Sequence, residues 1–318
     1  MLRYWKQNRE RFAFRLEQMT LQQRLVIAYI LIMLLPSLLI SLYIFQGLTG
    51  NTVREMERNN EYALEIEQIN IENNLETMKR AAERAFIDTE VRQYLVQPEL
   101  MSAFDLFELN RVSLQNIVKI QYNNPSIDLI RIYMSHPMTN EIFPVLYHES
   151  RILQDSWYRA VMDSDIEDVW IFSRITRELV QNRPGLTEVV KPKISLYQKL
   201  KSGEAHVGIV QVDMLLTNFF PNTFSPLQDD QSEMVVLDLE GEIFRNPANS
   251  FLERFGVGEE TLREQFSRLE HGEGKGSFKF NVAGVPLLGV YAYIEPLDAY
   301  MLKVASLKPV YDGINDTR

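Results

Sequence analysis

The pattern of apolar and polar positions divides the chain into three parts, and the first is an apolar run at residues 25–45. The run reads LVIAYILIMLLPSLLISLYIF and holds no charged side chain. As a helix it would rise about 31 Å, which matches a hydrocarbon core of about 30 Å. It is longer than the apolar core of a cleaved signal peptide, and residues 46–50 (QGLTG) offer no small-x-small cleavage site. We therefore predict a transmembrane helix at 25–45.

The charges on either side of this run predict its orientation. Residues 1–24 carry six basic and two acidic side chains, whereas residues 46–318 carry 27 basic and 41 acidic ones. Because basic residues accumulate on the cytoplasmic side, we expect a cytoplasmic basic N-terminus at 1–24 and an extracytoplasmic location for 46–318. The expected location is the cell membrane, with the lipid bilayer as one partner.

The second part, residues 46–122, has a helical pattern and is predicted to form a stalk. Between Asn51 and Phe86 there is no Pro or Gly, and Asn70, Asn73 and Asn74 interrupt an otherwise apolar stripe. A helix of this kind would pack partly on its own domain and partly on a second copy, so we expect a homodimer through the stalk. The apolar positions recur at helical spacing: Met56, Ala63, Ile66, Ile69, Leu75, Met78, Ala82 and Phe86.

In the third part, apolar and polar residues alternate as they do in β-strands. This pattern predicts two antiparallel-sheet modules, at 123–220 and 221–312. The fold class is therefore α+β, with a long N-terminal helix before two sheets. Lys201–Glu204 and Ala283–Pro286 are predicted turns, and Glu141–Tyr147 is predicted to pair with Ile127–Met134 across the turn at His136–Met138. The other expected strands are 168–173, 186–194, 205–212, 234–239, 242–245, 277–282, 287–294 and 300–306, with helices at 150–162, 213–220 and 259–269.

Composition and motifs argue against several classes of function. The net charge of -10 disfavours nucleic acid as a partner, because phosphate binding needs a basic face. The chain has no cysteine, and its four histidines show no metal-ligand spacing, so we expect no metal and no cofactor. The run HGEGKG at 271–276 would follow a helix and precede a strand, which is the wrong context for a phosphate-binding loop. We expect no enzymatic activity from these 318 residues.

A ligand pocket in the first module is the candidate site. It should be concave and partly aromatic, with a few convergent polar groups. Alternatively, the aromatic residues belong simply to the core. The candidates are Tyr133, Trp157, Tyr158 and Trp170 for the walls, and Arg131, Arg151, Lys191 and Lys193 for charge.

Three local patterns resemble the double Cache sensor domain, which consists of two PAS-like modules after a long helix. Trp157-Tyr158 lies in SWYRAVMDSD, as the WY pair of the Cache helix does; HVGIVQVDMLL resembles the strand that closes the first module, with Asp213 at the junction; and MVVLDLEGEIFRN resembles the hairpin that opens the second. The resemblance implies a membrane-distal module at 123–220, a membrane-proximal module at 221–312, and a small-molecule ligand to which Asp213 contributes.

The N-terminal run TLQQRLVIAYILIMLLPSLLISLYIF, placed before a Glu/Asn-rich helix, resembles the start of YesM-type sensor histidine kinases of Firmicutes. The resemblance implies a two-component system with an AraC-type response regulator. It also implies that 313–318 lead into a second transmembrane helix and a kinase half that are absent from this chain. The ectodomain of a Cache-type chemoreceptor or cyclase is the alternative, followed by a membrane-anchored surface enzyme and a passive structural protein.

The ligand class is the least defined expectation. The amino-acid-binding Cache pattern has an Arg two residues before the Trp, and this sequence has Asp155 there. That departure puts amino-acid sensing in doubt. Aromatic residues beside carboxylates suit a sugar, and the kinases that the chain resembles are often linked to carbohydrate uptake, so a sugar is the expected ligand.

Overall fold

The computed structural model describes residues 20–179, 186–225, 231–238, 240–267 and 274–310. The chain divides into two compact units. Residues 59–306 form the larger unit, and residues 1–58 together with 307–318 form the smaller one. Predictions that concern 1–19, the middle of the segment joining the sheets (226–230), His271 and 313–318 lie outside the described residues.

One continuous helix, α2 (Leu21–Ile87), accounts for 67 residues and contains Pro36. The predicted helix at 51–86 is thereby confirmed. The apolar run at 25–45 is the first part of α2 and no separate element, because the helix continues without a break into the charged residues Arg54, Glu55 and Glu57.

The predicted membrane span is wrong. Among the described residues, no helix combines the length and the apolar character that crossing a bilayer requires. The prediction counted uncharged positions and treated 25–45 as a helix of its own, whereas the structure makes them part of a much longer helix of mixed composition. The predicted location, a single membrane span with a cytoplasmic N-terminus and an extracytoplasmic part at 46–318, depended on this helix and is wrong as well.

The buried face of α2 differs from the predicted one in its first half. Ile69 is 58% exposed and Ile66 is also exposed, whereas Glu67 is fully buried. Glu67 is buried because it makes polar contacts at the junction of the two sheets, which are described below. A pattern of apolar positions does not reveal such contacts. From Leu75 onward the prediction is confirmed, since Leu75, Met78 and Ala82 are buried.

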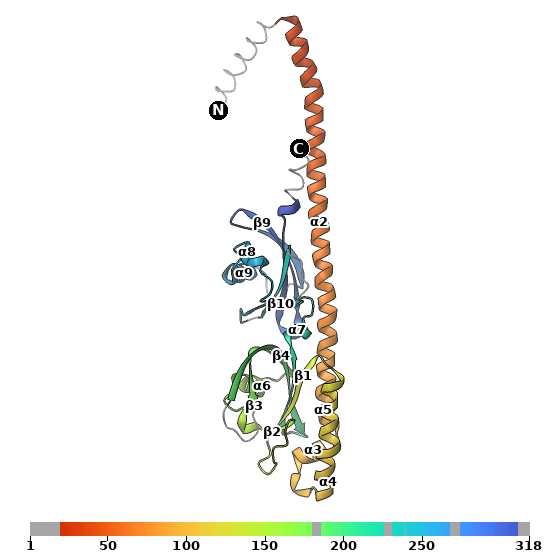
Figure 1. Ribbon diagram of the computed structural model, residues 1–318, viewed down its shortest axis with the longest axis vertical. Coiled ribbons are helices and arrows are strands. Elements are labelled where there is room, and N and C mark those ends of the chain that lie inside the picture. The colour runs from red at the N-terminus through yellow and green to blue at the C-terminus, as the bar shows by residue number, and fades with distance from the viewer. Residues whose placement is uncertain (1–19, 180–185, 226–230, 239, 268–273, 311–318) are drawn as a thin grey trace. The chain divides into compact units, whose positions relative to one another are not determined.

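A group of short helices follows α2 (Figure 1). Asp88 caps the first of them, as its carboxylate accepts hydrogen bonds from the backbone N–H groups of Glu90 (3.1 Å) and Val91 (3.2 Å). Pro98 opens a 3₁₀ turn, and a π-helical turn lies between the last two helices. Their bounds are α3 (Thr89–Val96), η1 (Pro98–Leu100), α4 (Ala103–Glu108), η2 (Leu109–Ser113) and α5 (Leu114–Asn123).

The first sheet has five strands in the order β2-β1-β5-β4-β3. The predicted turn at Gly203 joins β4 to β5 with a positive φ of 62°, which favours glycine. Between β2 and β3 lie η3 (Glu149–Arg151) and α6 (Ser156–Asp163), so the helix predicted at 150–162 is shorter. The strands are β1 (Ile127–Met134), β2 (Leu146–His148), β3 (Asp168–Leu179), β4 (Leu186–Ser202) and β5 (Ala205–Leu215).

The prediction for β2 is wrong in length and direction. Only three residues pair with β1, and they run parallel to it, with Ile132 opposite Leu146. Residues 135–145 do not form a tight turn; they carry the chain back only as far as Ile132, so that β2 lies beside the last three residues of β1, and they include the cis peptide bond Phe143–Pro144. A parallel neighbour needs such a long return, and alternation alone does not reveal it.

The second sheet repeats the arrangement in the order β7-β6-β10-β9-β8. Its expected strands are confirmed to within a few residues. One face packs on α8 and α9 through a cluster of buried apolar side chains that includes Phe251, Leu262 and Leu302. The elements are α7 (Leu216–Phe219), β6 (Ser232–Asp238), β7 (Ile243–Arg245), α8 (Phe251–Arg254), α9 (Glu259–Phe266), β8 (Lys275–Val282), β9 (Val285–Ile294), η4 (Glu295–Leu297) and β10 (Ala299–Ser306).

The junction between the sheets is bound to α2. The Glu67 carboxylate accepts hydrogen bonds from the backbone N–H groups of Asn222 (3.1 Å) and Thr223 (3.0 Å) and from the Thr223 hydroxyl (2.9 Å). Two helical turns further on, the Asn74 amide donates to the carbonyls of Asn218 and Phe219, each at 3.1 Å. Asn74, one of the three asparagines that interrupt the predicted apolar stripe, therefore attaches α2 to the junction.

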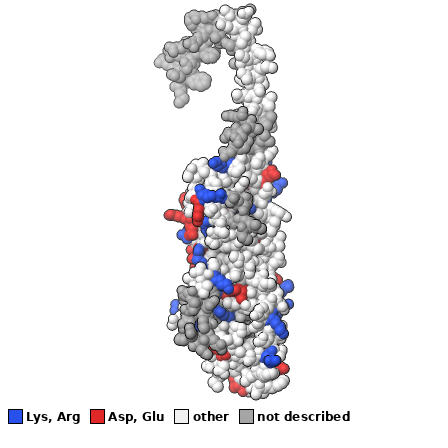
Figure 2. Space-filling model, viewed as in Figure 1, with Lys and Arg blue, Asp and Glu red and all other residues white. Residues whose placement is uncertain are grey.

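The predicted α+β class is confirmed: a long helix and two five-stranded sheets, antiparallel except for the β1–β2 pair, account for the described part of the chain. Figure 2 shows side chains of both charges interspersed over the visible face of the part that holds the sheets.

Candidate functional site

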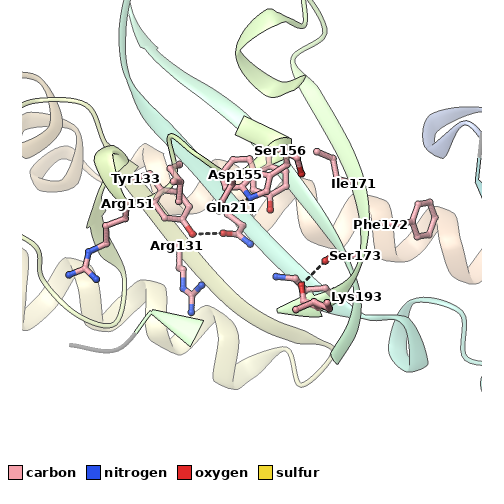
Figure 3. Close-up of a pocket in the computed structure, with 14 residues that line it drawn as sticks. Arg131, Tyr133, Arg151, Asp155, Ser156, Ile171, Phe172, Ser173, Lys193 and Gln211 are labelled. Atoms are coloured by element: carbon pink, nitrogen blue, oxygen red, sulfur yellow. Dashed lines mark hydrogen bonds between the residues drawn. The ribbon is translucent and has the colours of Figure 1, made fainter. Parts of the chain in front are cut away.

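A cavity of about 260 Å³ opens on one face of the first sheet (Figure 3). Strands supply its floor, and the segment between β2 and α6 supplies its wall. The volume lies just below the range of about 300–1,000 Å³ that is typical of ligand pockets, so it suits a small molecule. The lining residues are Arg131, Tyr133, Arg151, Ile152, Asp155, Ser156, Trp157, Ile171, Phe172, Ser173, Ile175, Lys193, Tyr197 and Gln211.

The floor follows from the alternation of side chains along the strands. Residues two apart point to the same face of a sheet, so Arg131 and Tyr133 of β1 lie together. Gln211 of β5 lies opposite Arg131 on one side and opposite Tyr197 of β4 on the other. Three neighbouring strands thus bring a guanidinium, an amide and two phenols to one surface.

A chain of hydrogen bonds runs along this floor. The Tyr133 hydroxyl donates to Gln211 Oε1 (2.7 Å), and Gln211 Nε2 donates to Asp213 Oδ1 (2.7 Å). Lys193 Nζ donates to the other oxygen, Asp213 Oδ2. Asp213 is fully buried and Lys193 is 5% exposed, so their ion pair lies in the protein interior. Both carboxylate oxygens of Asp213 therefore have partners.

The β1–β5 contact that carries Tyr133 requires a glycine. A Cβ atom at Gly208 would lie 2.3 Å from the carbonyl oxygen of Tyr133, which is a severe clash. Gly208 therefore allows the close approach of β5 to β1 at the end of the floor.

Aromatic rings form the wall above the floor. The Trp157 ring stacks on Tyr197 at a centroid distance of 4.0 Å and an interplanar angle of 18°, and lies 6.0 Å from Tyr133. Its indole N–H donates to Asp155 Oδ2 (3.1 Å). Trp157 is thereby held by a stacked ring and a hydrogen bond at the edge of the cavity.

One ion pair and one hydrogen-bonded contact hold the segment that precedes α6. Arg151 binds Glu141 through two hydrogen bonds, Nε–Oε1 at 2.6 Å and Nη2–Oε2 at 2.5 Å. Glu149 accepts from the Tyr158 hydroxyl (2.7 Å) and lies 3.0 Å from His206 Nε2. The contact between Glu149 and His206 joins the wall to the start of β5.

The electrostatics of the floor keep its phenols neutral and its guanidinium charged. Burial raises the pKa of Tyr133 and that of Tyr197 above the ordinary value for tyrosine. Burial on its own would lower the pKa of Arg131, but Tyr133, Tyr147 and Asp213 nearby hold it above its ordinary value. At neutral pH the floor therefore presents hydroxyl groups beside a permanent cation.

Five of the nine residues named from the sequence line the cavity: Arg131, Tyr133, Arg151, Trp157 and Lys193. Asp213 lies beneath them as the partner of Lys193, and Tyr158 stands next to the wall with its hydroxyl on Glu149. Trp170 is not among the lining residues. Its neighbour two positions on, Phe172, points away from the other labelled side chains in Figure 3 and stacks on Phe220 and Phe244.

The sequence argument missed Tyr197, Gln211 and Ile152. A signal was present for two of them, because Tyr197 shares a face with Lys193, and Gln211 shares one with Asp213. Lys191, also considered from the sequence, forms an ion pair with Asp128 at 2.5 Å and does not line the cavity. Within the described residues, no group of three or more His, Cys, Asp or Glu side chains is placed to hold a metal ion.

No protein-family model matches the chain. No curated protein matches it in sequence. Solved structures do match it in fold. One is the extracellular domain of a protein assigned as a histidine kinase, vpHK1S-Z8, with a TM-score of 0.54 and 14% identity over 86% of this chain and 97% of that one.

Two further matches come from other receptor classes. A domain of a sensory box/GGDEF family protein from Vibrio parahaemolyticus has a TM-score of 0.54 and 14% identity, over 83% of this chain and 99% of that one. The ligand-binding domain of the Campylobacter jejuni chemoreceptor Tlp3, solved with L-norvaline, has a TM-score of 0.54 and 12% identity, over 83% and 94%. The chain therefore has the fold of Cache-like sensor domains.

Proposed function

We propose that this chain is the ligand-sensing region of a signalling receptor and that it binds a small molecule in the cavity of the first sheet. The observation that carries the proposal is the convergence of Trp157, Tyr133, Gln211 and Arg131 on one concave surface of that sheet. Rigid aromatic walls with a few placed polar groups are typical of small-molecule sites. The sensor domains that share the fold support a sensing role over a catalytic one.

A histidine kinase is the output that we favour, on the resemblance of the N-terminal sequence to YesM-type kinases. The structural neighbours include a histidine kinase, a GGDEF protein and a chemoreceptor, so the fold alone does not select one output. The module boundaries at 123–220 and 221–312, the homodimer through the stalk and the AraC-type response regulator stay predictions.

The test is a thermal-shift screen of the 318-residue chain against sugars, amino acids and organic acids. For any compound that raises the melting temperature, Trp157→Ala should weaken binding by about tenfold or more, because it removes one wall of the cavity. The matched control is Trp170→Ala, which removes the same side chain from a position outside the cavity and should leave affinity unchanged. Compounds whose affinity is indifferent to Trp157→Ala would contradict the proposed site.

A further inference from the structure

The part of α2 that belongs to the larger unit has one buried and one exposed face. The buried face consists of Asn60, Leu64, Glu67, Ile71, Leu75 and Met78. The exposed face presents large apolar side chains to solvent: Tyr62 is 63% exposed and Ile66 39%. A group of such side chains on a protein surface marks an interaction site. Together with two asparagines they form what we call the exposed row: Asn59, Tyr62, Ile66, Ile69 and Asn73.

The exposed row has the spacing of a coiled-coil seam. Its members follow one another at intervals of three, four, three and four residues, which is the repeat along which two helices pack their side chains. Asn59, Ile66 and Asn73 are seven residues apart and occupy one kind of position in this repeat. Tyr62 and Ile69 occupy the other. The exposed row is therefore suited to another helix.

The two asparagines favour a second copy of the same helix as the partner. Asparagine at this kind of position specifies the register and a two-stranded pair, because two facing amides form hydrogen bonds with each other. An identical helix in register places Asn59 opposite Asn59 and Asn73 opposite Asn73. An apolar surface of another protein would instead bury both amides without a partner, which is unfavourable.

The side chains that flank the exposed row favour a parallel pair. Glu65 and Glu72 lie on one side of the row, and Asn70 and Thr77 lie on the other. In a parallel pair each glutamate faces the residue five positions further along the second copy, so that Glu65 meets Asn70 and Glu72 meets Thr77. In an antiparallel pair the glutamates face each other. Repulsion between these like charges disfavours the antiparallel arrangement.

We infer that α2 pairs with the α2 of a second copy, parallel and in register, through the exposed row. The inference rests on the homodimer of the proposed function and assigns it a face that differs in part from the predicted stripe, since Leu75 and Met78 are buried in their own chain. The paired segment is short. The next two positions beyond Asn73 are Glu76 and Arg80, which form an ion pair with each other at 2.6 Å. With three apolar side chains from each copy, the pair is weak, so a covalent trap is the suitable measurement.

The first experiment uses single cysteines. The chain has no cysteine of its own, so an introduced one is the only thiol. In the 318-residue chain, Asn59→Cys and Asn73→Cys should each form a disulfide-linked dimer under mild oxidation. The matched controls are Gln68→Cys and Glu72→Cys, at exposed positions outside the row. The row variants should link at least about tenfold faster than the controls, because paired helices hold the two thiols at a high effective concentration. Non-reducing gel electrophoresis at equal protein concentrations measures the rates.

The pattern of linked positions distinguishes the arrangements. Asn59 and Asn73 lie about 21 Å apart along the helix, so both positions can link to themselves only in a parallel pair in register. Linking of Asn59→Cys to Asn73→Cys in a mixture, but of neither variant to itself, would show an antiparallel pair and overturn the inference. Fast linking at Gln68→Cys or Glu72→Cys would also overturn it and leave the homodimer standing. If no row position links faster than the controls and the chain sediments as a monomer, the homodimer fails as well. The ligand-binding proposal has its own test and is unaffected.

The second experiment adds a charge to the row in the Asn73→Cys variant. Ile69→Asp should slow the linking at least about tenfold, because it brings two carboxylates face to face in the pair. Gln68→Asp, which adds the same charge one residue away, should leave the rate unchanged. Both positions are exposed in a single copy, so both variants should melt within about 2 °C of the parent. Equal linking rates for the two variants would overturn the inference. A much lower melting temperature for Ile69→Asp would do so too, because Ile69 would then serve the stability of its own chain.

Discussion

The two sheets share one strand order but differ in what they bury. Across the middle of the second sheet, Leu302 of β10 lies between Val235 of β6 and Tyr291 of β9. In the first sheet the central strand β5 instead places Gln211 between Arg131 and Tyr197. The apolar row belongs to a filled core, whereas the polar row forms the floor of a cavity.

The difference distinguishes a sheet built for stability from the sheet in which we propose the binding site. A buried apolar row gains free energy from every side chain removed from water. A buried polar row contributes little free energy, because each polar group loses its hydration and must find a hydrogen-bond partner in the protein. The second sheet shows that the same strand order can be built with an apolar face, so the polar groups of the first sheet are not required by the fold. Binding sites commonly reduce stability in this way.

The largest expected effect concerns the buried ion pair under the cavity. Asp213→Ala should lower the free energy of unfolding by about 3–5 kcal/mol, because it leaves the Lys193 ammonium buried without a counter-charge. Urea denaturation followed by circular dichroism would measure it.

The matched control for this pair is the double variant Lys193→Met/Asp213→Leu, which makes the floor resemble that of the second sheet. It should recover most of the loss, since an apolar pair of similar volume replaces a buried ion pair at little cost. A double variant as unstable as Asp213→Ala would show that the polar floor is needed for folding.

A smaller effect is expected from single substitutions in the central rows of side chains of the two sheets. Leu302→Ala should cost about 3 kcal/mol, because a fully buried leucine leaves a cavity behind. Gln211→Ala should cost about 1 kcal/mol, since Tyr133 loses one hydrogen bond but faces a cavity that admits water, and Asp213 loses one but keeps its ion pair with Lys193. Denaturant titrations of both variants test the comparison; equal losses would contradict it.

The smallest effect concerns Glu149 at the wall of the first sheet. Burial on its own would raise the pKa of Glu149, but hydrogen bonds from His206 and Tyr158 outweigh it and hold the pKa below its usual value. A lowered carboxyl pKa stabilises the folded state above the unfolded-state pKa, near 4.5, and this contribution is lost as pH falls through the folded-state pKa.

Glu149→Gln should therefore cost about 1 kcal/mol at pH 7 and progressively less below pH 4.5. Melting temperatures across pH 3–7 would reveal the converging curves. As a control, Glu76→Gln at the exposed ion pair with Arg80 should change the stability little at any pH in this range. Parallel curves for Glu149→Gln and the unmodified chain would contradict the assignment.

Local pattern was enough to predict most elements of this fold. Alternation located the long strands and Gly203 marked a hairpin, because each signal lies within a few residues. The strand β2 was predicted with the wrong length and direction, since its parallel direction depends on an eleven-residue return. Glu67 was missed for the same kind of reason: its partners lie 155 and 156 residues away.

The site was predictable in part. Trp157, Tyr133 and Lys193 stood out by residue type, and the structure brings them to one cavity. Gln211 and Tyr197 are ordinary by type and become notable only when β1, β5 and β4 are in register.

The attachment of the sheet junction to α2 has a mechanical consequence. Strand β5 carries Asp213 and ends at Leu215, and the next eight residues reach both Asn74 and Glu67. Asn74 donates to backbone carbonyls and Glu67 accepts from backbone N–H groups, and the two residues lie about 10 Å apart along the helix axis. Hydrogen bonds weaken steeply with misalignment, so the end of β5 cannot shift without displacing α2 or breaking them. As long as these hydrogen bonds hold, a displacement of the end of β5 moves α2 with it.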